Sequence, residues 1–246
     1  MRDSAAETNG DTSGKAAADQ PGINLAGANS AGANSAGANL TAALDAAVHF
    51  GIDRRQPQPA PAAVVQALIA AEQQAKAHRF RHDYGQVLGT WRLTFITGTR
   101  KARQRAGIAL GAGKFLPAWV KITIGYGQGA LPTIGGQPSP TPESDHQGQV
   151  LNTVACGGLK LAVGGLVQLH RNRILAFDFT RMTASLGALP LYSGYIRQGA
   201  DRERRFYQQP VKEQAFFTYF WITEQAIAAR GRGGGLALWV REPEET

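Results

Sequence analysis

NRILAFDFT, residues 172–180, has large apolar side chains at every second position. Leu175, Phe177 and Phe179 share one face of an extended strand, while Asp178 and Thr180 lie on the other face. This alternation is typical of an antiparallel strand that has a core on one side and water on the other. Arg171-Asn172-Arg173 leaves a hairpin-sized gap between this run and the apolar run before it.

The same two-residue period continues over most of the chain after Gln86. A second hairpin-sized gap lies at Gly231–Gly235, and Gly164-Gly165 inside an apolar run indicates a bulge or a barrel corner. Many short strands without helices between them predict a barrel or a sandwich, and closure into a barrel removes exposed edges. The alternating apolar sets are Trp91, Leu93 and Phe95; Val120, Ile122 and Ile124; Leu159, Leu161 and Val163; Phe217, Tyr219 and Trp221; and Leu236, Leu238 and Val240.

The chain before the strands has a different pattern. Residues 26–40 repeat a five-residue unit, Ala-Gly-Ala-Asn-Ser, in which Leu40 replaces the last serine. Since the repeat has no large apolar side chain before Leu40, residues 1–58 are predicted to be a disordered, removable low-complexity tail. Within it, Thr41–Phe50 has apolar residues that favour a short helix. Prolines mark a linker after it. Apolar residues then recur at helical spacing from Ala62 to about Phe80, which predicts one helix before the barrel.

Composition restricts the class of protein. The 246 residues carry a net charge of +8, with 43% hydrophobic and 18% charged residues. Residues 1–60 hold four basic and six acidic side chains, which leaves +10 on the rest and favours an anionic partner. Cys156, the single cysteine, excludes an intramolecular disulfide and an all-cysteine metal site. No apolar run is long enough for a membrane-spanning helix, and the N-terminus does not have the pattern of a secretory signal.

Several motifs together resemble one family. Gly89-Thr90-Trp91 at the first strand looks like the G-x-W start of a lipocalin-type barrel. With Asn172–Phe179, Leu186–Leu191, Thr218–Thr223 and Ala229–Leu236, residues 62–242 resemble the plastid lipid-associated proteins, also called plastoglobulins or fibrillins. The resemblance implies a lipocalin-like barrel in a plastid or a cyanobacterium. It also implies binding of an isoprenoid, carotenoid, quinone or acyl chain, without catalysis and without a cofactor.

Two groups of residues are the candidate site of such a protein. One group would line the barrel interior: Leu93, Phe95, Leu161, Val163, Phe177, Phe179, Tyr219 and Trp221. A solid core is the alternative, because small barrels either fill with side chains or hold one small ligand. The other group would close one end, with Gly89 starting the strand and Trp91 as a plug. Arg230, or as second choice Arg241, would lie over the Trp91 ring.

The basic surface gives a further expectation. Arg100, Lys101, Arg103 and Arg105 form the strongest cationic cluster and would contact anionic lipid at a thylakoid. The expected location is a cyanobacterial cytoplasm with peripheral thylakoid association, or alternatively a plastid stroma, thylakoid or plastoglobule. An RNA-binding or scaffold protein with a solid barrel is the alternative function. His78 and His82 are more typical of a helix surface than of a metal site, and no catalytic group of residues is recognisable.

Overall fold

The computed structural model describes residues 25–98, 113–131 and 140–243. The chain divides into two compact units, Met1–Ala36 and Gly37–Thr246, and the described strands all belong to the second. The helices are α1 (Leu25–Ile52), which begins in the first unit, α2 (Pro61–Ala77), η1 (Tyr84–Val87), α4 (Gly199–Arg205), η3 (Phe206–Gln208) and η4 (Val211–Glu213). The strands are β1 (Gly89–Ile96), β2 (Lys114–Phe115), β3 (Lys121–Gly127), β4 (Gln147–Cys156), β5 (Leu159–His170), β6 (Ile174–Leu186), β7 (Leu189–Tyr195), β8 (Ala215–Ile222), β9 (Ala226–Gly231) and β10 (Leu236–Arg241).

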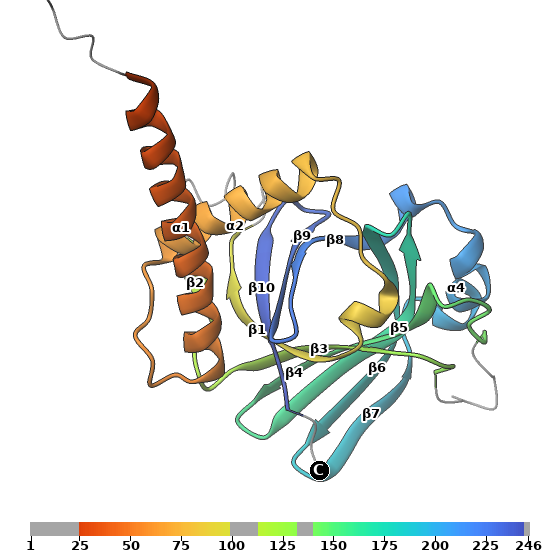
Figure 1. Ribbon diagram of the computed structural model, residues 1–246. Coiled ribbons are helices and arrows are strands. Elements are labelled where there is room, and N and C mark those ends of the chain that lie inside the picture. Colours follow the sequence, from red (N-terminus) through yellow and green to blue (C-terminus); the bar gives the residue numbers. More distant parts are fainter. Residues whose placement is uncertain (1–24, 99–112, 132–139, 244–246) are drawn as a thin grey trace, which may run out of the picture. The chain divides into compact units, whose positions relative to one another are not determined.

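Eight of these strands form a closed antiparallel barrel (Figure 1). The ring runs β1–β3–β4–β5–β6–β8–β9–β10 and closes where β10 pairs with β1, for example at Trp91 and Arg241. β2 pairs with β1 and β7 pairs with β6, both outside the ring. The predicted fold class, a mainly β chain with an antiparallel barrel preceded by a helix, is confirmed.

A bulge in β6 lets part of the sheet extend past the ring. Ile174–Phe177 pairs with β8, whereas Arg181–Leu186 pairs with β7, and the register shifts between Gly164 and Gly165 of the neighbouring β5. Gly165 is required there, because a Cβ would lie 1.7 Å from the carbonyl oxygen of Asp178. The bulge predicted at these glycines is confirmed. Beyond it, residues 151–163 and 181–195 form what we call the projecting sheet (Figure 1).

Aromatic and aliphatic side chains pack together inside the barrel. They come from all eight strands of the ring and from η1. The buried members of this interior cluster are Tyr84, Val87, Trp91, Ile124, Tyr126, Val150, Val167, Leu169, Leu175, Phe177, Tyr219, Ile227, Ala229 and Trp239.

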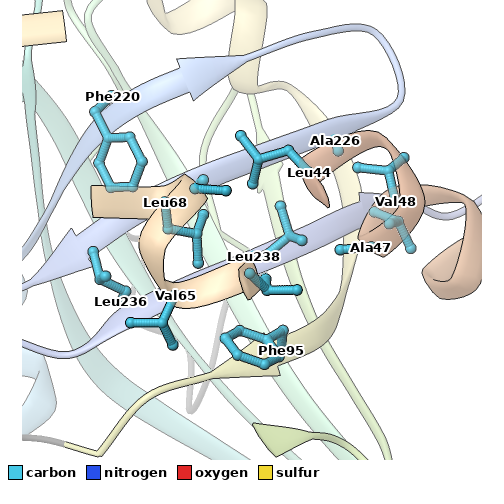
Figure 2. Packing of buried hydrophobic residues seen from close by; sticks show 14 residues of the cluster. Leu44, Ala47, Val48, Val65, Leu68, Phe95, Phe220, Ala226, Leu236 and Leu238 are labelled. Atoms are coloured by element: carbon cyan, nitrogen blue, oxygen red, sulfur yellow. The ribbon is translucent and has the colours of Figure 1, made fainter. Parts of the chain in front are cut away.

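A second cluster lies on the outside of β8, β9, β10 and β1, under α1 and α2 (Figure 2). Val65 and Leu68 of α2 lie against this face, as the apolar spacing of residues 62–80 predicts. Leu236, Leu238 and Val240 belong to this outer cluster, while Trp239 between them points into the barrel. Both faces of β10 are therefore buried, which is why alternation alone does not identify its inner face.

The helix expected at Thr41–Phe50 is present as part of α1, but the prediction that the tail is disordered and removable up to residue 58 is wrong for this part. Leu44, Ala47, Val48 and Phe50 are buried, and the first three lie against the outer cluster in Figure 2. The spacing of Leu44 and Val48 puts them one helical turn apart on the same face, which explains their joint burial. The earlier part of that prediction, residues 1–24, lies outside the described residues.

Candidate functional site

One end of the barrel is closed by Trp91 and Arg241. Trp91 is fully buried, and its indole N–H donates a 2.7 Å hydrogen bond to the carbonyl of Val87. The guanidinium of Arg241 lies 3.9 Å from the centre of the Trp91 ring, a cation–π arrangement. Arg241 also donates to the carbonyls of Leu88 and Glu224, at 3.1 and 2.6 Å. The Arg241 side chain at the end of β10 therefore connects β10 with β1, with the residue after η1 and with the β8–β9 turn.

Gly89 makes room for this arginine. It has a φ of +105°, and a Cβ at this position would lie 2.6 Å from the Nη1 of Arg241. A side chain would therefore be strained by the backbone and would displace the guanidinium. The Gly-x-Trp motif thus has a structural role at the closed end.

Arg230 does not take part in this closure, so that part of the prediction is wrong. It lies on the outer face of β9 and donates to the carboxylate of Glu72 on α2, with an Nε to Oε1 distance of 2.8 Å. This hydrogen bond holds the pKa of the buried Glu72 carboxyl below its usual value. Ala229 points into the barrel, so Arg230, next along the strand, points out. Arg230 therefore fastens α2 to the barrel.

A polar layer lies inside the barrel between η1 and β8. The hydroxyls of Tyr126 and Tyr219 are 2.8 Å apart, and Tyr84 donates to the carbonyl of Gly127 at 2.9 Å. Burial raises the pKa of all three tyrosines, which keeps them neutral. The ring of His82 meets Tyr219 edge to face at 5.7 Å and is 2% exposed. These neutral groups hold the loop after α2 against the barrel.

Acid should weaken this loop through His82. Burial lowers the pKa of its imidazole below the usual 6.5, and its Nε2 has no hydrogen-bond partner in the described structure. The unfolded chain therefore takes up a proton before the folded one does, so stability falls as the pH drops below about 6.5. We expect the free energy of unfolding in urea to depend less on pH in His82→Phe than in the unmodified protein. The control is His78→Gln, which removes an exposed histidine. An unchanged slope in His82→Phe would show that other groups, such as the half-buried His170, cause the acid sensitivity.

Four of the eight predicted interior side chains do belong to the interior cluster. Phe177 lies 5.1 Å from both Phe179 and Phe217, measured between ring centres, and Phe217 lies 5.4 Å from Trp239. These contacts link β6, β8 and β10 across the barrel. The interior is thus packed with aromatic rings in this region. The four predicted residues placed there are Leu93, Phe177, Phe179 and Tyr219.

Two other candidates face outward, so their prediction as interior residues is wrong. The register shifts between Leu93 and Phe95 in β1, and between Tyr219 and Trp221 in β8. One extra residue in a strand reverses the face of every residue that follows it. Phe95 therefore packs in the outer cluster with α2, and Trp221 packs against the same cluster.

The last two candidates, Leu161 and Val163, lie on the projecting sheet. They share the face of β5 that continues from Val167 in the interior, but they lie beyond the closed ring. Leu161 is exposed and Val163 is half-buried. The inner face of the barrel thus continues as an open apolar surface.

Leucines form the outer row of this surface. Leu159 pairs with Leu186, and Leu186 pairs with Leu189, so three strands place a leucine side by side. They are 48%, 53% and 61% exposed. The turns of the two hairpins are joined, since the amide of Gly187 donates to the carbonyl of Gly158 at 2.8 Å. We call Leu159, Leu186 and Leu189 the leucine row.

Trp119 belongs to the same end of the sheet. It precedes β3 by two residues, and Lys121 of β3 pairs with Ala155, next to the tip of the β4–β5 hairpin. Its side chain is 70% exposed. Sequence reasoning missed Trp119 as well as Leu186 and Leu189. The available signal was the pair of leucines on either side of a Gly-Ala turn, without an acidic residue in 181–195.

Other expectations concern different parts of the chain. The predicted membrane cluster Arg100, Lys101, Arg103 and Arg105 lies outside the described residues. In the described ranges, three or more His, Cys, Asp or Glu side chains do not gather in a way that could hold a metal ion. The described helices include none that is long and apolar enough to cross a membrane.

No protein-family model matches this chain. No curated protein matches it either. Among solved structures, the chain is similar to a redesigned β-barrel with 9% sequence identity, a coverage of 67% of this chain and 98% of that chain, and a TM-score of 0.30. A similarity at this level carries no information on function.

Proposed function

We propose that the protein binds a lipid or another apolar molecule, without catalysis, on the inner face of its projecting sheet. The observation that carries this proposal is the leucine row, in which three adjacent strands expose one leucine each on a face continuous with the barrel interior. Exposed apolar surface that is contiguous, rather than scattered, marks binding sites. The resemblance to plastid lipid-associated proteins supports a lipid of a photosynthetic membrane as the ligand.

The charge and shape of this end favour a membrane surface as the place of binding. Residues 151–163 and 181–195 contain no acidic residue. Their exposed basic residue is Lys160, since Arg181 is buried in an ion pair with Glu203. Exposed Trp119 adds the type of side chain that gathers at the interface between lipid and water. Because each leucine of the row is about half exposed, its transfer from water into an apolar phase contributes on the order of 1 kcal/mol. The two joined hairpins would dip into one leaflet of the membrane.

Because the barrel interior is packed with side chains, the proposed ligand binds on the projecting sheet and not inside the barrel, where a hollow barrel would hold it. Phe217 contacts both Phe177 and Trp239 in the region that a lipocalin-like ligand would occupy. The packed interior also agrees with the alternative, an RNA-binding or scaffold protein. Against that alternative, two of the arginines in Arg202–Arg205 are ion-paired, Arg202 with Asp178 and Arg204 with Asp201.

Vesicle flotation tests the proposal. The variant Leu159→Ser/Leu186→Ser/Leu189→Ser should bind phosphatidylcholine vesicles containing phosphatidylglycerol about tenfold or more weakly than the unmodified protein. Leu151→Ser is the matched control, because Leu151 is a 51% exposed leucine on the opposite face of β4. Its binding should be unchanged.

Trp119 provides an independent readout. Its emission should shift to the blue when vesicles are added. Trp119→Phe should remove most of that shift, because Trp91 and Trp239 are already buried and Trp221 packs against the outer cluster. Equal flotation of the triple variant and the unmodified protein would refute the proposal. Binding to RNA that salt abolishes, without vesicle binding, would support the alternative function instead.

A further inference from the structure

A groove with a volume of about 990 Å³ lies on the outer face of the barrel. Its floor comes from β1, β3 and β4. Its walls include the end of α1, the β8–β9 turn and residues Arg241–Pro243 at the end of β10. The groove does not overlap the leucine row. Along β4 and β5 its residues alternate with those of the apolar face, so they lie on the opposite side of the sheet. The volume is in the range of sites for small ligands.

Three threonines line the floor of this groove. Thr123 and Thr153 are directly opposite each other on β3 and β4, and Thr90 lines the groove from β1. Gly125, across from Thr90, leaves open space beside the Thr90 hydroxyl, since a Cβ there would lie 3.6 Å from it. Because the strand amides are used in the sheet, these hydroxyls are the hydrogen-bonding groups that the floor offers to a ligand.

Two lysines define one end of the groove. Lys121 and Lys160 both pair with Ala155, so they lie on either side of it in the same row. Lys121 is 2.5 Å from Glu242, and Arg92 donates to the same carboxylate. Glu242 is therefore already held by two cations. Within the described residues, Lys160 has no acidic group within 4.0 Å. The β8–β9 turn, with Glu224, forms the opposite wall.

We propose that this groove is a second site, which binds the phosphate group of a small anionic ligand between Lys160, Lys121 and the threonine hydroxyls. A cation is a poor match, because the Glu242 carboxylate beside the two lysines already has two positive partners. A phosphate ester accepts hydrogen bonds from ammonium groups and from hydroxyls at once. The site stands independently of lipid binding on the other face. Its ligand is either a phospholipid headgroup or a soluble phosphate ester.

Titration with glycerol 3-phosphate, followed by calorimetry and by amide chemical shifts, tests the site. We expect saturable binding at low salt, with shifts at Thr123, Thr153 and Lys160. Lys160→Gln should weaken binding about tenfold or more, because a charge-assisted hydrogen bond is lost. Thr153→Val, which keeps the side-chain shape, should weaken it by a smaller factor.

Matched controls lie outside the groove. Lys212→Gln removes an exposed lysine of η4, and Thr183→Val removes an exposed threonine hydroxyl of β6. Both variants should bind glycerol 3-phosphate like the unmodified protein. Absence of saturable binding, or equal weakening by Lys160→Gln and Lys212→Gln, would overturn the proposal.

Short-chain phosphatidylglycerol below its micelle concentration separates the two sources of phosphate. Tighter binding of the lipid than of glycerol 3-phosphate, weakened by Lys160→Gln by the same factor, assigns the site to a lipid headgroup. Equal binding of both probes assigns it to a soluble phosphate ester. Glycerol 3-phosphate should bind the leucine-row variant normally in either case, so a failure of the proposed function and a failure of this site are distinguishable.

Discussion

Removal of residues 1–52 is expected to lower the melting temperature by on the order of 10 °C. The deletion takes Leu44, Val48 and Phe50 away from the outer cluster and from Phe115, whose ring centre lies 4.9 Å from that of Phe50. It also uncovers Val240 and Thr94, both within 3 Å of where a Cβ on Gly51 would lie. Loss of one buried leucine typically costs ~2–5 kcal/mol, and ~1 kcal/mol shifts the melting temperature of such a chain by ~2–4 °C.

A shorter deletion is the control for this prediction. A chain that starts at Gly37 keeps the whole second unit, including the α1 side chains of the outer cluster, Leu44, Ala47 and Val48, so its melting temperature should stay within about 2 °C of the full chain. Leu44→Ala in the full chain should reproduce part of the loss. Equal melting of the Asp53-start and Gly37-start proteins would show that α1 contributes nothing to stability, as the sequence-based prediction of a removable tail requires.

The sequence predicted the barrel well because alternation and turn residues are local signals. Arg171 and Asn172 both have positive φ in the β5–β6 turn, and Gly231–Gly235 joins β9 to β10, as their spacing predicts. Gly164-Gly165 marks the bulge because glycine is the residue that tolerates the close approach of Asp178 from the neighbouring strand β6.

The candidate site was less predictable because it depends on the partners of each strand. Phe95 and Trp221 continue the alternation of Trp91 and Tyr219, yet a register shift in each strand turns them outward. Such a shift is visible only in the pairing with the neighbouring strand. The sequence offers both Arg230 and Arg241 as partners for Trp91 and led us to prefer Arg230. The position of α2, with Glu72 buried beside Arg230, decides for Arg241.

The leucine row could not be separated from core residues by pattern. Leu161 and Val167 lie on the same face of β5, but the first is exposed and the second is buried. The difference arises where β6 leaves β8 and pairs with β7, so that the sheet continues without a strand opposite it. An alternating apolar face therefore predicts a surface to be covered, but the topology determines whether protein covers it.

The packed interior leads to the last prediction. Phe177→Ala should reduce the free energy of unfolding by about 3–5 kcal/mol, because the side chain is 6% exposed and has aromatic neighbours on both sides. A hollow barrel would instead lose mainly the transfer energy of the ring. Phe177→Leu, which keeps most of the volume, should cost about 1 kcal/mol. Urea unfolding of the three proteins measures both differences.

Binding measurements on the same variants locate the apolar ligand. If lipid binds on the projecting sheet, Phe177→Ala at a temperature where it is folded should float with vesicles as well as the unmodified protein. The leucine-row variant should show the reverse, normal stability with weak flotation, because its three side chains are already exposed to water. A small stability loss in Phe177→Ala together with a strong change in lipid affinity would place the ligand inside the barrel. That result would contradict the assignment of binding to the leucine row.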